Sequence, residues 1–159
     1  MLRIRRYATR SIWKRNMATA ETSAEVPDGF EPHPRRSPIT EPWEPIYFRK
    51  TAKAYILGLR LAKAHTNSRG LVHGGLIATL ADNAMGLSCS VNMADPQRLV
   101  TISLAVDYLG SANIGQWLQI DTNFVKVGGS ICFAQSLITA DGEPCARGNA
   151  TFKILRKKD

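Results

Sequence analysis

The chain has 159 residues, 44% of them hydrophobic and 21% charged, which is an ordinary composition for a soluble protein with one compact domain. Its formal net charge of +8 arises at the two ends, because residues 1–20 hold six Lys or Arg and residues 153–158 hold four. Residues 21–152 are close to neutral, with eleven basic and twelve acidic side chains. A nucleic-acid-binding domain carries a basic stripe on its fold, so this distribution argues against a nucleic-acid partner.

The first 20 residues, MLRIRRYATRSIWKRNMATA, are rich in Arg, contain Ser and Thr, and lack acidic side chains. This composition is similar to that of a mitochondrial transit peptide, and it lacks the apolar core of a secretory signal. The alternative is an upstream extension of the reading frame, with translation starting at Met17. In either case we expect this basic N-terminal segment to lie outside the fold.

Cysteine and histidine usage points to a reducing compartment and to no metal site. The three cysteines, Cys89, Cys132 and Cys145, are widely spaced, and neither they nor the three histidines show the spacing of metal ligands. We therefore expect reduced thiols and no bound metal. The expected location is the cytoplasm, or the mitochondrial matrix if the first 20 residues are a transit peptide.

A proline-rich segment follows the basic N-terminus. Six of the eight prolines lie between Pro27 and Pro45, a density that neither a helix nor a central strand tolerates. We expect residues 21–45 to form an extended arm that is ordered only where it lies against a partner surface. The folded domain is expected to cover residues 46–156.

Hydrophobic periodicity after residue 46 predicts two strands, one long helix and four further strands. The expected ranges are 46–51, 54–64, 99–108, 117–127, 130–140 and 145–155 for the strands and about 74–92 for the helix. Gly128-Gly129 and Asp141-Gly142 are hairpin signals, which makes the last strands antiparallel neighbours. The predicted fold is α+β, with a long central helix wrapped by a curved antiparallel sheet of five or six strands. One helix cannot cover such a sheet completely, so we expect a homo-oligomer.

The predicted helix lies in a stretch, from Gly74 to Ala94, whose one charged side chain is Asp82. Its apolar residues spread around the helical wheel, so we expect the helix to be buried nearly all round. A buried carboxylate is costly unless it is paired or used, and no Lys or Arg lies at helical spacing from Asp82. Asp82 is therefore either paired with a cation from elsewhere in the chain or a general base or nucleophile in a dry site. The same carboxylate argues against a membrane-spanning helix.

The residues His73-Gly74-Gly75 stand at the entry to this helix. Backbone N–H groups of the first turn have no partner within the helix, and glycine lets a ligand atom approach them closely. The alternative is a glycine turn that only packs the helix against the sheet. An N–H group that holds a carbonyl oxygen and a carboxylate that activates water are what acyl transfer requires. Since eight helical residues span about 12 Å, Gly74 and Asp82 are expected to meet only across a two-fold dimer with antiparallel helices.

The segments HTNSRGLVHGGLIATLADNAMG, LVTISLAVDYLGSA and FVKVGGSICFA closely resemble the hotdog-fold acyl-CoA thioesterases of the phenylacetate-degradation type. The resemblance extends over about residues 46–155. It implies a hydrolase of acyl-CoA thioesters that uses no cofactor, since coenzyme A is carried by its substrate. It also implies a homodimer, often assembled further into a homotetramer.

The resemblance assigns roles to individual residues. Asp82 corresponds to the catalytic carboxylate, and Gly74 to the N–H group that polarises the thioester carbonyl. Asn67 corresponds to a side chain beside the thioester that is contributed, with Gly74, by the partner chain. Thr101 corresponds to a hydroxyl that orients water, and His73 shapes the turn before the oxyanion glycine.

Coenzyme A is expected, from the same resemblance, to contact the loops at residues 108–113 and 127–132. The candidate contacts are Tyr108, Ser111, Gly128 and Ser130. Lys126 and the basic residues 156–158 could meet its phosphates, although a solvated run of charge is the alternative for the tail.

Two other functions compete with hydrolysis. A hotdog hydratase or dehydratase acting on enoyl or hydroxyacyl thioesters typically pairs a His with an acid, and His73 has no second His nearby. A non-catalytic acyl-CoA-binding protein would have little reason to keep Asp82 in an apolar helix. The sequence leaves the acyl group open.

Overall fold

The computed structural model describes residues 25–155, so the predicted basic N-terminal segment and the tail at residues 156–158 lie outside the described residues. The described chain forms one long α-helix, two short 3-10 helices and seven strands. The helices are η1 (Glu41–Trp43), η2 (Lys63–His65) and α1 (Gly74–Val91). The strands are β1 (Glu31–Pro32), β2 (Tyr47–Lys50), β3 (Tyr55–Arg60), β4 (Arg98–Tyr108), β5 (Trp117–Val127), β6 (Ile131–Ala140) and β7 (Glu143–Leu155).

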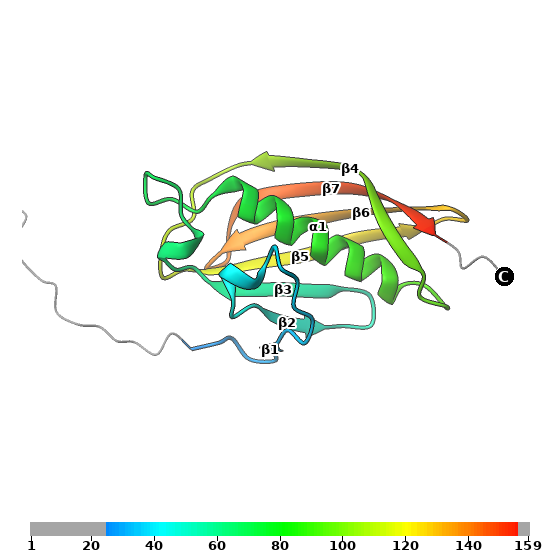
Figure 1. Ribbon diagram of the computed structural model, residues 1–159, viewed down its shortest axis with the longest axis horizontal. Helices are drawn as coiled ribbons and strands as arrows, with labels where there is room; N and C mark the ends of the chain where they lie inside the picture. Colours follow the sequence, from blue (N-terminus) through cyan, green and yellow to red (C-terminus); the bar gives the residue numbers. More distant parts are fainter. Residues whose placement is uncertain (1–24, 156–159) are drawn as a thin grey trace, which may run out of the picture.

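The seven strands form one antiparallel sheet in the order β1-β2-β3-β5-β6-β7-β4. Helix α1 lies across one face of this curved sheet (Figure 1), and its contacts reach β3, β4, β5, β6 and β7. This arrangement confirms the expected α+β hotdog fold. Among the described strands, β4 has a neighbour, β7, on one side alone.

The sheet has seven strands rather than the expected five or six, because the proline-rich arm supplies an additional one. Glu31 and Pro32 pair with Phe48 and Tyr47 of β2 at the edge of the sheet. A proline is acceptable at an edge because its missing N–H group is not needed by a further strand.

The hairpin between β6 and β7 has the expected turn geometry. Asp141 and Gly142 both have positive φ angles, 49° and 88°. Two consecutive positive φ angles are typical of the type I′ turn, whose twist matches that of antiparallel strands. The sequence pair Asp-Gly therefore fixes the register of these strands.

Burial of α1 is one-sided, so the expectation that the helix is buried nearly all round is wrong for one chain. The side facing the sheet is buried and consists of Leu76, Ile77, Leu80, Ala81, Ala84, Met85, Ser88 and Cys89. The opposite side is half-buried, with Asp82 as its one charged residue. One sheet can cover only one side of a helix, which accounts for the difference. Within residues 25–155, no helix combines the length and apolarity needed to cross a bilayer.

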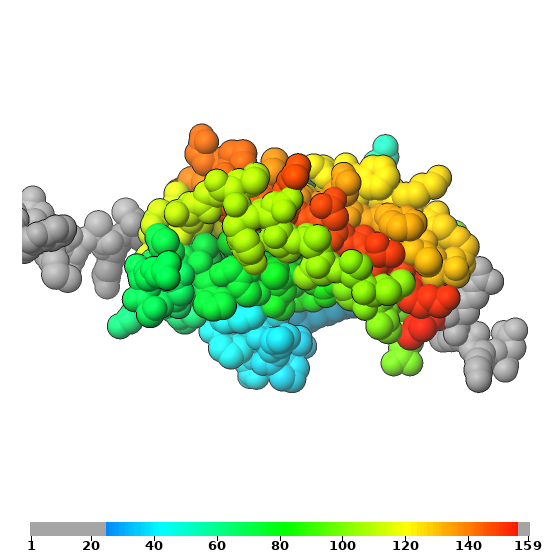
Figure 2. Space-filling view, turned by 90° about the horizontal axis from the view of Figure 1, so that it is seen from above, coloured from blue at the N-terminus to red at the C-terminus, as the bar shows by residue number. Residues whose placement is uncertain are grey.

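The arm, here residues 25–45, lies against its own chain. The N–H of His33 donates to the carbonyl oxygen of Ile46 at 2.8 Å, and the carbonyl oxygen of Trp43 lies 3.2 Å from Nε2 of His65. In Figure 2 the cyan part of the arm projects beyond the green helix on the side away from the sheet. The arm thus lies against β2 and η2 of its own chain, and the domain boundary at residue 46 stays a prediction.

Candidate active site

His73 caps the N-terminus of α1 and leaves one backbone N–H group free. Its Nδ1 accepts the N–H of Gly75 at 2.9 Å, and its carbonyl oxygen accepts the N–H groups of Leu76 and Ile77 at 3.0 and 3.4 Å. The N–H of Gly74 has no acceptor within the described part of the chain. Since a helix N-terminus carries the positive end of the helix dipole, this N–H group is available to a carbonyl oxygen or an oxyanion.

Asn67 presents a second hydrogen-bond donor near this helix end. Its Oδ1 accepts the N–H groups of Arg69 at 2.9 Å and of Leu71 at 3.3 Å. These two bonds fix which end of the side-chain amide is oxygen, so the other end is the NH2 group. No bond from that NH2 group to another described residue is present, and it can therefore donate to a ligand.

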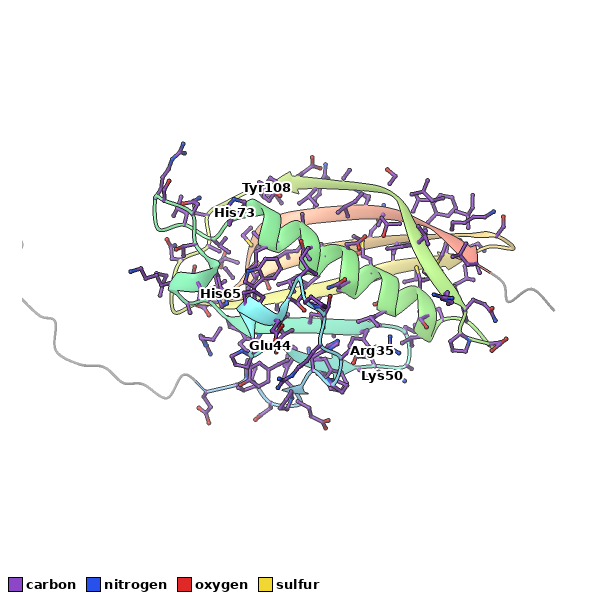
Figure 3. The ribbon with its side chains drawn as sticks, viewed as in Figure 1. Arg35, Glu44, Lys50, His65, His73 and Tyr108 are labelled. Atoms are coloured by element: carbon purple, nitrogen blue, oxygen red, sulfur yellow. The ribbon has the colours of Figure 1, made fainter. Side chains whose placement is uncertain are left out.

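The candidates Asn67, Gly74, Tyr108 and Ser111 line one cavity of about 210 Å³. Two of the four carry the free donors described above. We name this space the amide cavity, after the backbone N–H group of Gly74 and the side-chain amide of Asn67, two residues that line it. Figure 3 shows Tyr108 and His73 close together at the N-terminal end of α1.

Tyr108 holds the backbone of Gly74 in place. Its hydroxyl donates to the carbonyl oxygen of Gly74 at 2.7 Å. A Cβ atom added to Gly74 would lie 2.9 Å from Cζ of the Tyr108 ring, which is closer than such contacts normally come. A side chain at position 74 would therefore have to displace the tyrosine ring that packs on the helix end.

Asp82 lies two turns further along α1, on the half-buried side of the helix and within reach of the edge strand β4. Oδ1 of its carboxylate accepts the hydroxyl of Thr101 at 2.8 Å. No ion pair among the described residues involves Asp82. Burial raises the pKa of its carboxyl group above the ordinary value, and the Thr101 hydrogen bond opposes part of that rise. The carboxylate is thus half-buried and has no ion-pair partner in the described part of the chain, and burial of this kind makes a carboxylate more basic.

A bulge in the edge strand accounts for the position of Thr101. The pairing of β4 with β7 shifts register between Thr101 and Ser103, and Ile102 between them is 57% exposed. A bulge bends the strand and re-aims a side chain. Thr101 and Asp82 line the same cavity of about 520 Å³, which we name the carboxylate cavity.

The described chain does not bring the two halves of the predicted site together. Gly74 and Asn67 line the amide cavity, whereas Asp82 and Thr101 line the carboxylate cavity, and no residue lines both. The separation follows from the helix, since eight residues rise about 12 Å. His73 faces neither cavity and lines a third, together with Gly75 and Thr79.

The four candidates for coenzyme A contact also divide between the two ends of the sheet. Tyr108 pairs with Ala146 at one end, close to Gly74. Gly128 and Ser130 flank the turn between β5 and β6 at the other end, where the carbonyl oxygen of Ser130 accepts the N–H of Ile154 at 2.9 Å. One chain therefore cannot offer all four to the same part of a ligand.

The described part of the chain contains no cluster of potential metal ligands. Among residues 25–155, no group of three or more His, Cys, Asp or Glu side chains is close enough to hold an ion. Cys89, Cys132 and Cys145 are free and buried, and burial raises the pKa of each thiol.

Sequence reasoning missed several residues around Asp82. Arg35, Asn83 and Leu87 line the carboxylate cavity, and Arg35 comes from the arm that was expected to lie outside the domain. The available signal was the Arg-Arg pair in the proline-rich segment HPRRSP, since most residues of that segment are uncharged. Only the structure shows that this pair lies next to α1.

The amino-acid sequence is similar to those of known thioesterases and esterases. The family model described as the thioesterase superfamily matches residues 69–146. A candidate esterase of Pseudomonas aeruginosa is 33% identical over 130 residues, which cover 81% of this chain and 97% of that protein. Human acyl-coenzyme A thioesterase 13 is 32% identical over 100 residues, or 60% of this chain and 69% of that protein.

Solved structures of thioesterase-superfamily and CoA-bound proteins have a similar fold. Zebra fish thioesterase superfamily member 2 matches with a TM-score of 0.68 and 24% identity, over 75% of this chain and 88% of that chain. A Bacillus halodurans protein that was crystallised with CoA matches with a TM-score of 0.58 and 30% identity, over 63% of this chain and 66% of that chain.

Proposed function

Because the chain belongs to the thioesterase superfamily, we propose that it hydrolyses acyl-CoA thioesters to a free acid and coenzyme A. The observation that carries this proposal is the half-buried carboxylate of Asp82, which accepts a hydrogen bond from a hydroxyl group and forms no ion pair within residues 25–155. The name of the human relative and the CoA bound to the Bacillus halodurans protein support the substrate class.

Asp82 acts as the general base in this proposal. The Thr101 hydroxyl uses its proton in the bond to Oδ1, so its lone pairs can accept a hydrogen bond from water. A water molecule that donates one proton to Thr101 and the other to Oδ2 of Asp82 would keep its own lone pair directed outward. That lone pair attacks the thioester carbonyl carbon while Asp82 takes the proton. The alternative is direct attack by the carboxylate, which expels the thiolate and makes a mixed anhydride that a water molecule hydrolyses in a second step.

The free N–H of Gly74 and the NH2 group of Asn67 stabilise the oxyanion that forms during this attack. In comparable sites one such donor contributes about 2.7–4 kcal/mol to the transition state. The proton taken up by the base can then reach the departing thiolate sulfur, which leaves as the thiol of coenzyme A. The products are a carboxylic acid and a thiol, and the atoms of one water molecule are consumed.

A second copy of the chain brings the two cavities together. With antiparallel α1 helices, the amide cavity of one chain faces the carboxylate cavity of its partner, and two equal sites result. The unpaired edge of β4 supports this dimer, since Val100 and Ile102 on it are 52% and 57% exposed. The weakly polar outer side of α1, which would be covered in the dimer, supports it as well.

A dimer of dimers stays a prediction. The face of the sheet that turns away from α1 carries Phe124 and Phe133, each 48% exposed. Exposed aromatic side chains on a sheet face are typical of a contact between subunits, and this favours a homotetramer over a dimer.

Release of free thiol from a panel of acyl-CoA substrates tests the proposed function. Asp82→Asn should lower turnover by about 10²–10⁴-fold, the usual contribution of a general base, while the fold and the oligomer persist. Asp28→Asn removes a carboxylate from an exposed turn and serves as the matched control. Near-normal hydrolysis by Asp82→Asn would contradict the proposal, and hydration of crotonyl-CoA without thiol release would favour the hydratase alternative.

A further inference from the structure

A cavity of about 260 Å³ lies between the arm and α1, and we name it the arm cavity. It adjoins the carboxylate cavity, because Arg35, Asn83 and Leu87 line both. Asn83 directly follows Asp82 in the helix. A group attached to a thioester at Asp82 can therefore extend past Asn83 into the arm cavity.

The two walls of the arm cavity differ in chemistry. The wall formed by the body of the domain is mostly apolar: it contains Ile46, Leu57, Leu80 and Leu87, with Asn83 as its one polar side chain. The wall formed by the arm is polar and contains His33, Arg35, Arg36, Ser37 and Thr40. A ligand that matches both walls is an aliphatic chain that also carries a polar group.

The polar wall has two positive charges that the described chain does not neutralise. Neither Arg35 nor Arg36 takes part in an ion pair within residues 25–155. Arg35 is close enough to β3 for its charge to affect Tyr55. Burial raises the pKa of Tyr55, and the positive charge of Arg35 opposes part of that rise. In Figure 3 Arg35 lies on the side of α1 where the arm and β2 are found, away from His73 and Tyr108.

We propose that the arm cavity receives the acyl group of the substrate and that Arg35 and Arg36 select acyl chains ending in a carboxylate. A guanidinium group binds a carboxylate through paired, charge-assisted hydrogen bonds, and the leucine-rich wall binds the methylene groups between the two ends. A chain of the same length ending in a methyl group would gain the apolar contacts alone. This inference rests on the proposed thioester hydrolysis at Asp82.

The test compares adipoyl-CoA with hexanoyl-CoA, which have the same chain length and differ in the terminal group. The full chain should show a kcat/KM for adipoyl-CoA that is on the order of tenfold higher, the effect of one charge-assisted hydrogen bond. Arg35→Gln and Arg36→Gln should each lower the ratio of the two kcat/KM values toward one, mainly through the KM of adipoyl-CoA. Lys53→Gln removes a positive charge from an exposed turn outside both cavities and should leave this ratio unchanged.

The possible outcomes separate this inference from the proposed function. If no substrate of the acyl-CoA panel releases thiol, the proposed hydrolysis fails, and the inference fails with it. If other members of the panel release thiol but neither adipoyl-CoA nor hexanoyl-CoA does, hydrolysis stands and the inference is overturned. If both are hydrolysed and hexanoyl-CoA is equal or preferred, hydrolysis stands and selection by charge is overturned. If adipoyl-CoA is preferred and the double variant Arg35→Gln, Arg36→Gln keeps that preference, the arm is not the selecting wall, which also overturns the inference.

Discussion

The hydroxyl of Thr101 donates a 2.8 Å hydrogen bond to Oδ1 of Asp82, and this bond joins the edge strand β4 to the middle of α1. The bulge after Thr101 directs the hydroxyl toward the helix. The hydrogen bond to the Asp82 carboxylate therefore depends on the bulge in β4. Oδ2 is left for a water molecule or a substrate. The proposed chemistry depends on the different roles of the two carboxylate oxygens: Oδ1 accepts the Thr101 hydrogen bond, and Oδ2 faces the reacting water.

Thr101→Val removes the hydroxyl and nearly keeps the side-chain volume. We expect kcat to fall by about tenfold, which corresponds to the loss of one hydrogen bond of about 1.4 kcal/mol. Because that bond lowers the pKa of Asp82, its loss raises the pKa, and the acidic limb of the kcat/KM profile should move to higher pH. Thr101→Ser keeps the hydroxyl and should keep the profile of the unmodified chain. An unchanged acidic limb in Thr101→Val would show that Asp82 does not titrate in the reaction.

Asp82→Asn should be more stable than the unmodified chain at neutral pH. The pKa of Asp82 in the folded protein lies above its ordinary value of 3.8, so the folded state binds the proton more tightly than the unfolded state. The ionised carboxylate therefore destabilises the folded state. The free energy of unfolding falls as the pH rises from 3.8 through the folded-state pKa, because the carboxyl group loses its proton over this range. Urea denaturation at pH 7 and pH 4 measures it. A variant that is less stable at pH 7, or equally more stable at both pH values, would contradict this account.

Gly74→Ala should destabilise the protein through the ring of Tyr108. The added methyl group would lie 2.9 Å from Cζ, and overpacking of this kind costs about 1–3 kcal/mol. Tyr108→Ala in the same chain removes the ring, so the two effects should not add in a double-mutant cycle. Denaturant unfolding of the two single variants and the double variant gives the coupling energy. Strict additivity would mean that the ring does not determine the choice of glycine.

His73 should contribute to stability as a helix cap, with no role in proton transfer. His73→Ala removes the acceptor for the N–H of Gly75 and should cost about 1 kcal/mol of unfolding free energy. His73→Asn supplies a capping oxygen and should restore most of that loss. Neither variant should move the limbs of the pH–rate profile. A limb that disappears in His73→Asn would assign an acid–base role to the imidazole.

The fold could be predicted from sequence because its signals are local. The apolar run after Gly74 gives the helix, and the pair Asp141-Gly142 needs no distant partner to form its turn. The candidate carboxylate was also visible, since a single charge in a long uncharged helix is unusual. Its hydrogen bond to Thr101 puts a hydroxyl beside the carboxylate, and the water-orienting role that the family resemblance implies for Thr101 stays a prediction.

The arm could not be predicted because its contacts join residues that are distant in the chain. Pairing of Glu31 with Phe48, and the 3.2 Å approach of His65 to the carbonyl oxygen of Trp43, depend on how loops fold back on the sheet. Proline density indicates an irregular segment and says nothing about the surface that it covers. The Arg-Arg pair of the arm is visible in the sequence, but for the same reason nothing near it indicates that Arg35 lies beside α1.

Subunit mixing tests most directly whether one site is built from two chains. Asp82→Asn removes the base, and Asn67→Asp removes the NH2 donor while keeping the oxygen that accepts the loop N–H groups. Each variant alone should be nearly inactive. Random mixing makes about half of the dimers mixed, each with one intact site of two, so about a quarter of the unmodified activity should return. Activity no higher than the mean of the two separate variants, in dimers shown to have exchanged subunits, would contradict a shared site.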